Sequence, residues 1–227
     1  MALLRKILAG LRRNGNLQQK LDWEFEWQST QWASVFKDPE NQRKCHEYWV
    51  RFRHLDDIRK RVPLDDTTNI LDVGCGISTV LHYLPGRRHG IDPLAERYKT
   101  IYEYPKDIDI QEGSGESIQF PDRHFDLVTC SNCIDHTQSP TDTVAEIERV
   151  LRPGGHLVLT CEAFPTDLGE RNAAHPHSMT IDSLRTLTKR FETIEHWDEP
   201  WYGLLNYVLG NPPTTQREQI LLLRKPL

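Results

Sequence analysis

Hydrophobic positions divide the chain into two parts with different periodicity. Residues 22–62 carry apolar and aromatic side chains at helical spacing, and Asp38-Pro39 marks a turn between two helices. From residue 68 onward, short apolar runs alternate with amphipathic segments, a pattern typical of βαβ units around a parallel sheet. We therefore predict an N-terminal helical cap over 1–67 and an α/β domain over 68–227.

The elements predicted for the α/β domain follow one another closely. Strands are expected at 69–73, in a run ending at 90–92, and at 107–111, 125–130, 156–161, 191–196 and 220–223. Helices are expected from the first strand to about residue 84, and over 94–103, 141–151 and 181–187. This alternation predicts a doubly wound, Rossmann-like α/β fold with a mainly parallel seven-stranded sheet.

The first twenty residues are cationic and amphipathic. Five basic residues and no acidic one precede Asp22, and aliphatic side chains repeat at helical spacing. A lid or packing helix is the first interpretation. A peripheral membrane contact through residues 1–20 and a transit peptide are the alternatives.

Composition limits the function classes. The 227 residues include 33 acidic and 28 basic side chains, a net charge of -5, so there is no basic surplus for tight nucleic-acid binding. Mean hydropathy is -0.61, and no apolar run approaches the roughly 20 residues of a membrane-spanning helix. Five scattered cysteines form no disulfide framework, which predicts a cytoplasmic location.

Cys130 and Cys133 form a single CxxC pair. A zinc site would need a second pair, and the spacing of His175 and His177 does not match a zinc-binding pattern. The sequence therefore predicts no metal site.

A glycine-rich turn follows the first predicted strand. The glycines of Gly74-Cys75-Gly76 allow the backbone to approach a ligand closely, in front of a predicted helix N-terminus. Asp92 ends the second strand, twenty residues after Asp72, where a carboxylate can accept the hydroxyls of a ribose. The two features predict a nucleoside ligand, and Thr79 in place of a third glycine disfavours NAD.

Further segments up to residue 161 complete a set of motifs. They are Ile70–Gly76, Gly90–Asp92, Gly113–Pro121, Phe125–Val128, Ile134–His136, and Glu146 with Arg149–Gly155. In this order and spacing they resemble the class I S-adenosylmethionine (SAM)-dependent methyltransferases, and most of all the branch with quinone-biosynthesis-type small-molecule enzymes. The resemblance implies a last strand that is antiparallel, SAM as cofactor, and S-adenosylhomocysteine as product.

The resemblance also implies cofactor-binding roles for the matched residues. The turn Gly74, Cys75 and Gly76 would pass the methionine moiety of SAM, with Asp72 ordering it, and Asp92 would bind the ribose hydroxyls. The remaining positions would border the adenine (Ser114, Gly115 and Glu116) or the sulfonium (Cys130, Ser131 and Asn132). The family commonly has Asp, which contacts the adenine, where this chain has Ser114; the Ser114 hydroxyl could accept the same bond, and we expect either weaker polar discrimination or compensation from Glu116.

Methyl transfer requires an acceptor aligned with the sulfonium, exclusion of water and, for a hydroxyl acceptor, a base. His136 follows the fourth strand at the carboxyl edge of the sheet, where doubly wound folds bind ligands. It is the leading candidate for the base. His175 and His177 follow the fifth strand and are further catalytic candidates at the same edge.

We therefore expect a SAM-dependent methyltransferase that acts on oxygen of a small-molecule, glycan or lipid-linked acceptor. The chain reads Ser131-Asn132-Cys133-Ile134 where amino-group methyltransferases have an Asn-Pro-Pro-aromatic motif, which favours oxygen over nitrogen. An NAD(P)-dependent oxidoreductase is one alternative, although Tyr102 and Lys106 lie outside the helix that such a catalytic pair needs. A non-catalytic SAM-binding regulatory protein is the other alternative. The sequence does not determine the oligomeric state.

Overall fold

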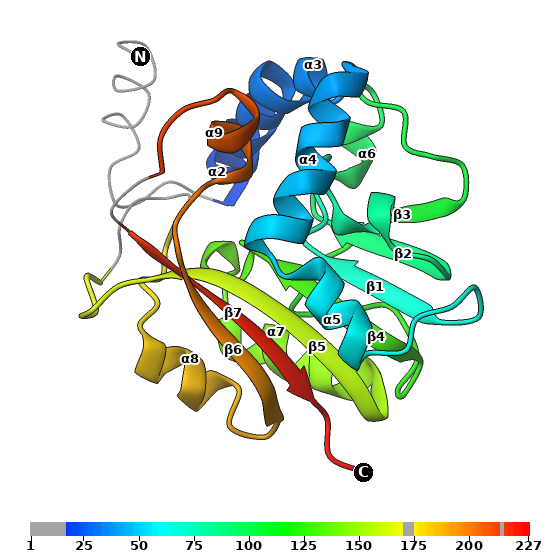
Figure 1. Ribbon diagram of the computed structural model, residues 1–227, viewed down its shortest axis with the longest axis vertical. Helices are drawn as coiled ribbons and strands as arrows, with labels where there is room; N and C mark the ends of the chain where they lie inside the picture. The colour runs from blue at the N-terminus through cyan, green and yellow to red at the C-terminus, as the bar shows by residue number, and fades with distance from the viewer. Residues whose placement is uncertain (1–16, 170–174, 214–215) are drawn as a thin grey trace.

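Seven strands pair into one central sheet (Figure 1). The computed structural model describes residues 17–169, 175–213 and 216–227. The strands are β1 (Asn69–Val73), β2 (Arg87–Asp92), β3 (Ile108–Glu112), β4 (Phe125–Ser131), β5 (Leu151–Ala163), β6 (Glu192–Pro200) and β7 (Arg217–Arg224). Their order across the sheet is β3-β2-β1-β4-β5-β7-β6.

Strand directions confirm the predicted fold class. β1 runs parallel to both β2 and β4, and the parallel pairing continues to β3 on one side and β5 on the other. β7 is antiparallel to its neighbours β5 and β6, as the family resemblance implied for the last strand. The carboxyl ends of the parallel strands therefore meet at one edge of the sheet, where ligands bind in doubly wound folds.

Each face of the sheet has its own hydrophobic core, because successive side chains of a strand point to opposite faces. Leu71 packs in the core that includes α7 (Pro140–Val150) and α8 (Ile181–Leu187). Ile70 packs in the other core, with α5 (Leu55–Arg61) and the end of α4 (Pro39–Phe52). The central strands β1, β4, β5 and β7 are thus largely buried on both faces, which explains why most of their residues are apolar.

The residues before β1 form a series of helices above the sheet edge. They are α2 (Leu17–Trp27), the π-helical turn η1 (Gln28–Trp32), α3 (Ala33–Val35), α4 and α5. The predicted turn at Asp38-Pro39 is confirmed, because the Asp38 carboxylate accepts the Glu40 amide at 2.9 Å and caps α4. Most of the cationic segment 1–20 lies outside the described residues. Within the described part, no helix has the length and hydropathy needed to cross a bilayer.

Aromatic side chains join these helices to the rest of the chain. Trp32 and Phe36 are buried in a third cluster with Tyr98. The ring of Tyr48 in α4 lies 5.8 Å from that of Tyr207 in α9 (Leu204–Val208), so a late segment covers the early helices. These aromatic contacts hold the helices and the late segment together.

Two predicted helices are much shorter than the sequence pattern indicated. The glycine turn is followed only by the 3-10 turn η2 (Val80–Tyr83), because Pro85 and Gly86 end the segment at once. α6 (Ala95–Tyr98) occupies only part of 94–103. In both segments the burial of a few apolar side chains, not helical propensity, determines the local conformation.

β5 is longer than predicted. Its pairing with β4 begins at Leu151, before the predicted start at residue 156, and shifts register before His156, around Pro153-Gly154-Gly155. Because of this irregularity in the pairing, Pro153, Gly154 and Gly155 lie within one long strand.

Candidate cofactor and acceptor site

The Gly74–Gly76 turn leaves β1 at the carboxyl edge of the sheet. Both glycines adopt positive φ, 69° at Gly74 and 52° at Gly76. A Cβ atom on Gly74 would lie 2.1 Å from Cys133 Sγ, so this position accepts no larger residue without movement of its neighbour. Cys75 is buried in the core beneath the turn. The turn therefore exposes backbone rather than side chains to the sheet edge.

A buried hydrogen-bond network orders this turn. Asp72 accepts the hydroxyl of Thr79 and the hydroxyl of Thr129, each at 2.6 Å. Burial raises the pKa of the Asp72 carboxyl to about 6, against the lowering effect of both hydroxyls. Thr79 also accepts the amide of Leu81 at 3.1 Å. The threonine that replaces the third glycine of a dinucleotide motif thus has a structural role that sequence reasoning missed.

Asp92 lies at the end of β2, directly beside the glycine turn. Its two carboxylate oxygens accept the amides of Gly76 at 3.1 Å and Leu94 at 2.9 Å. Burial raises the pKa of the Asp92 carboxyl to about 7, against the lowering effect of these amides. The structure therefore brings two predicted cofactor residues, Gly76 and Asp92, into direct contact.

The loop after β3 contains the other predicted nucleoside contacts. Ser114 donates its hydroxyl to Glu116 at 2.5 Å, while the second Glu116 oxygen accepts the amides of Gln138 at 2.6 Å and Ser139 at 3.3 Å. A Cβ atom on Gly115 would lie 2.8 Å from the Thr143 side chain, so the loop packs closely on α7. Burial by itself raises the pKa of Glu116, but these hydrogen bonds outweigh it and lower that pKa. Glu116 thus joins two loops, which its motif position did not indicate.

The chain turns sharply after β4, and this turn positions the acceptor side of the site. Cys130 is fully buried, and the Ser131 hydroxyl lies 2.8 Å from that of Thr160 on β5. Asn132 has a φ of 51°, and its amide donates to the Thr160 carbonyl at 2.9 Å. Asparagine tolerates this left-handed conformation better than most residues. The following residues are thereby held at the carboxyl edge of the sheet.

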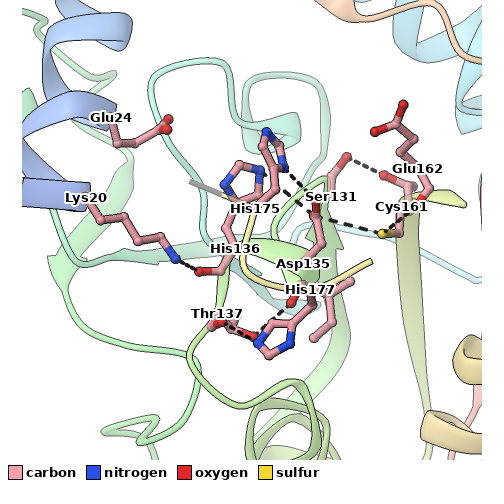
Figure 2. A network of polar contacts seen from close by, with 12 residues as sticks. Lys20, Glu24, Ser131, Asp135, His136, Thr137, Cys161, Glu162, His175 and His177 are labelled. Atoms are coloured by element: carbon pink, nitrogen blue, oxygen red, sulfur yellow. Dashed lines mark hydrogen bonds and ion pairs between the residues drawn. The ribbon is translucent and has the colours of Figure 1, made fainter. Parts of the chain in front are cut away.

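Two histidines from different segments converge there on one buried carboxylate (Figure 2). Asp135 is 2% exposed and belongs to the 3-10 turn η3 (Ile134–His136). His175 Nδ1 lies 2.8 Å from one Asp135 oxygen, and His136 Nε2 lies 3.9 Å from the other. The two imidazole rings are 4.2 Å apart between centroids, and Figure 2 shows them side by side. Sequence reasoning selected both histidines but missed Asp135.

Charge and burial act in opposite directions within this cluster. Burial raises the pKa of Asp135, but His136 and the hydrogen bond with His175 outweigh it, so the pKa lies below its usual range. Burial lowers the pKa of His136, which the nearby Asp135 only partly opposes. At neutral pH the cluster therefore combines an ionised carboxylate with a neutral His136.

His177 is not part of the cluster. Its Nε2 donates to the carbonyls of Thr137 at 3.0 Å and Gln138 at 3.3 Å, and in Figure 2 its ring points away from the other two histidines. Because this nitrogen is bonded to backbone oxygens, His177 pins its own segment to the loop after β4. Of the three predicted catalytic histidines, the structure brings only His136 and His175 together.

Helix α2 and the π-helical turn η1 cover the site from the N-terminal side. Lys20 donates to the His136 carbonyl, and Glu24 extends from the same helix in Figure 2. Gln28 donates to Glu24 at 3.0 Å, whereas its Oε1 atom is buried without a hydrogen-bond partner among the described residues. The Gln28 side chain lies beside Gly76: a Cβ atom on Gly76 would be in van der Waals contact with it, 3.8 Å from Gln28 Nε2. Sequence reasoning missed Gln28, because only its distant contacts reveal it.

Comparison with known proteins indicates a methyltransferase domain. A family described as a methyltransferase domain matches residues 71–159. The uncharacterized methyltransferase YcgJ of Bacillus subtilis is 29% identical over 174 residues, which cover 67% of this chain and 69% of YcgJ. The uncharacterized methyltransferase C1B3.06c of Schizosaccharomyces pombe is 32% identical over 107 residues, 40% of this chain and 38% of that protein. The chain thus spans well under half of the second relative.

Solved structures show the same fold. The crystal structure of YcgJ has a TM-score of 0.58 at 18% identity and covers 78% of this chain and 100% of its own. The [4+2]-cyclase SpnF has a TM-score of 0.61 at 20% identity, covering 77% and 80%. A SAM-dependent methyltransferase from Methanosarcina mazei has a TM-score of 0.58 at 17% identity, covering 75% and 97%. Likeness at these identities establishes the architecture alone.

Proposed function

Because the chain belongs to the class I SAM-dependent methyltransferase family, whose methyl donor is SAM, we propose that it methylates a hydroxyl oxygen of a small-molecule acceptor. One observation carries the choice of a hydroxyl: the Asp135–His136–His175 cluster beside the glycine turn. Cys133, at the start of the same segment, fills the space over Gly74. A base at this position would lie next to an acceptor aligned with the methyl group.

The residues around the glycine turn fit SAM. The buried Gln28 Oε1, which has no hydrogen-bond partner among the residues that the structure describes, is an acceptor beside Gly76 and suits an ammonium group such as that of the methionine moiety. Asp92 has a buried carboxylate at the strand end where ribose hydroxyls would donate. We propose that Gln28 binds the methionine moiety of the cofactor and Asp92 its ribose, with Ser114 and Glu116 bordering the adenine.

Three side chains would take part in removing the proton of the acceptor hydroxyl. When bound, SAM would supply a methyl group on a positive sulfur; the acceptor oxygen would bond to that carbon as the carbon–sulfur bond breaks, with the electron pair left on sulfur. His136 Nε2 would take the hydroxyl proton, since burial lowers the pKa of this imidazole and leaves it neutral. Asp135 would stabilise the imidazolium that forms, and His175 holds Asp135 in position.

The sequence gives a second argument for an oxygen acceptor. The absence of an Asn-Pro-Pro-aromatic motif after β4, where Ser131 to Ile134 stand, supports oxygen over nitrogen. Within hydroxyl acceptors, we propose a small molecule, with a glycan or a lipid-linked compound as the alternatives. The peripheral membrane contact through residues 1–20 stays a prediction.

Two measurements test the proposal. Calorimetry should detect binding of SAM and S-adenosylhomocysteine and none of NAD; failure of both sulfur compounds to bind would refute the assignment. Mass spectrometry of a metabolite extract incubated with methyl-labelled SAM should reveal a labelled methyl ether. A labelled amine instead would refute the choice of oxygen.

A variant pair tests the base. His136→Ala should lower turnover by about 100-fold, within the usual contribution of general-base catalysis, while SAM affinity stays nearly unchanged. The matched control is His46→Ala, an exposed histidine of α4, which should have the normal rate. A normal rate in His136→Ala would remove this residue from the mechanism.

A further inference from the structure

We propose that Asp135, His136 and His175 form a binding site for a divalent transition-metal cation. Among the described residues, each of the three offers one ligand atom, and these atoms all lie within 4.8 Å of one another. They come from two segments 40 residues apart, η3 and the segment after β5, which meet at the carboxyl edge of the sheet (Figure 2). Sequence spacing predicted no metal site, because it compared cysteines and histidines without Asp135.

The separations are close to those of a metal centre. Ligand atoms about 2.0–2.2 Å from a tetrahedral zinc ion lie about 3.4 Å from one another. His175 Nδ1 is 2.8 Å from one oxygen of Asp135, and His136 Nε2 is 3.9 Å from the other. These two distances bracket the tetrahedral value, and all three donor atoms lie within 4.8 Å of one another, so they are near enough to share one ion.

A hydrogen bond alone does not explain the arrangement. The bond between His175 and Asp135 accounts for those two residues. It does not account for His136, whose Nε2 faces the same carboxylate beyond hydrogen-bond distance and whose ring is in contact with that of His175. A cation placed between the carboxylate and both imidazoles satisfies all three groups at once.

The donor set selects the class of metal. Two imidazole nitrogens and one carboxylate suit zinc, iron(II) and neighbouring first-row ions. Magnesium and calcium prefer sites built from oxygen ligands. The positive charge of Lys20 lies near this site, but its ammonium group hydrogen-bonds the His136 carbonyl rather than the Asp135 carboxylate. The site therefore favours a transition metal over magnesium.

Three protein ligands leave an open position, which gives the ion a role in catalysis that rests on the proposed function. An acceptor hydroxyl that occupies this position has a lower pKa and releases its proton to water, so that the oxygen is ready to attack the methyl carbon. In that case His136 acts as a ligand, and the cation takes over the activation assigned above to the imidazole.

Calorimetry on the full chain, stripped with a chelator that is then removed, tests the site. We expect one Zn²⁺ bound per chain, no measurable Mg²⁺ binding, and a loss of Zn²⁺ affinity of about 100-fold or more in His136→Ala and in His175→Ala. His46→Ala is the matched control and should bind Zn²⁺ normally. Absence of Zn²⁺ binding to the wild type would overturn the proposal. Unchanged binding in the His136→Ala/His175→Ala double variant, which would place the ion elsewhere, for example on cysteine thiols, would also overturn it.

A SAM titration of the same samples separates the two proposals and checks that each variant is folded. SAM binding without Zn²⁺ binding would refute the metal site and leave the methyltransferase with His136 as base. Zn²⁺ binding that depends on both histidines, without SAM binding, would refute the proposed function and retain the metal site.

Discussion

Lowering the pH from about 8 to about 6 should weaken SAM binding, because it protonates the buried carboxyl of Asp92. Burial raises the pKa of this carboxyl to about 7, although the amides of Leu94 and Gly76 lower it in part. Ribose hydroxyls donate hydrogen bonds, so they bind better to a carboxylate, which only accepts, than to a protonated carboxyl. SAM should therefore bind the ionised form and release a proton from the fraction that is protonated.

The size of the effect follows from the pKa of Asp92. A carboxyl with a pKa near 7 is about 90% ionised at about pH 8 and about 10% ionised at about pH 6, so the Kd of SAM should rise about tenfold over this interval. Stability has the opposite dependence. The native pKa lies above the unfolded value of 3.8, so the ligand-free protein binds more protons than the unfolded chain and loses stability as pH rises through this range.

Calorimetry at both pH values, in two buffers of different ionisation enthalpy, measures the Kd and counts the released protons. Asp92→Asn is the control, because it keeps the shape and cannot titrate; its affinity should be lower, and the tenfold difference should disappear. Equal Kd values for the wild type at the two pH values would refute the reasoning. A tenfold difference that persists in Asp92→Asn would assign it to another group.

Three further predictions concern the free energy of unfolding, measured by urea denaturation. Gly74→Ala should cost about 2–4 kcal/mol, because its Cβ would meet Cys133 Sγ in a left-handed conformation; Cys133→Ala should recover part of this loss, and additive effects would contradict the contact. Thr79→Val should cost about 2–3 kcal/mol, since the buried Asp72 carboxylate loses one of its two hydroxyl donors and the Leu81 amide loses its acceptor; an unchanged midpoint would contradict this network. Arg53 at the end of α4 and Glu218 in β7 form a buried ion pair. Arg53→Met should therefore cost about 3–5 kcal/mol by leaving Glu218 buried and unpaired, and Glu218→Gln in the same chain should restore more than half of this loss. A double variant no more stable than Arg53→Met would show that the pair is not coupled.

The central strands could be predicted closely because burial on both faces gives them mostly apolar sequence. β1 and β4 match their predicted ranges to within one residue. The helix expected after Gly76 could not be predicted in the same way. Its apolar residues, Val80 and Leu81 among them, pack into the core on one face of the sheet. This packing, together with Pro85 directly after the segment, limits it to a 3-10 turn.

A site residue could be predicted from the sequence where it directly follows a strand, because the strand then determines where in the fold the residue lies. Gly76, Asp92 and His136 each end a strand–turn unit, so the parallel sheet brings them to one edge. Asp135 had no signal of its own, because its importance comes from His175, whose place in space depends on a segment 40 residues away. An isolated histidine after a strand supports a base, whereas two imidazoles on one buried carboxylate support either a base with an oriented carboxylate or a metal centre. The structure therefore changes the question at His136 from whether it takes part in the chemistry to whether it binds a proton or a cation, and the zinc titration distinguishes these roles.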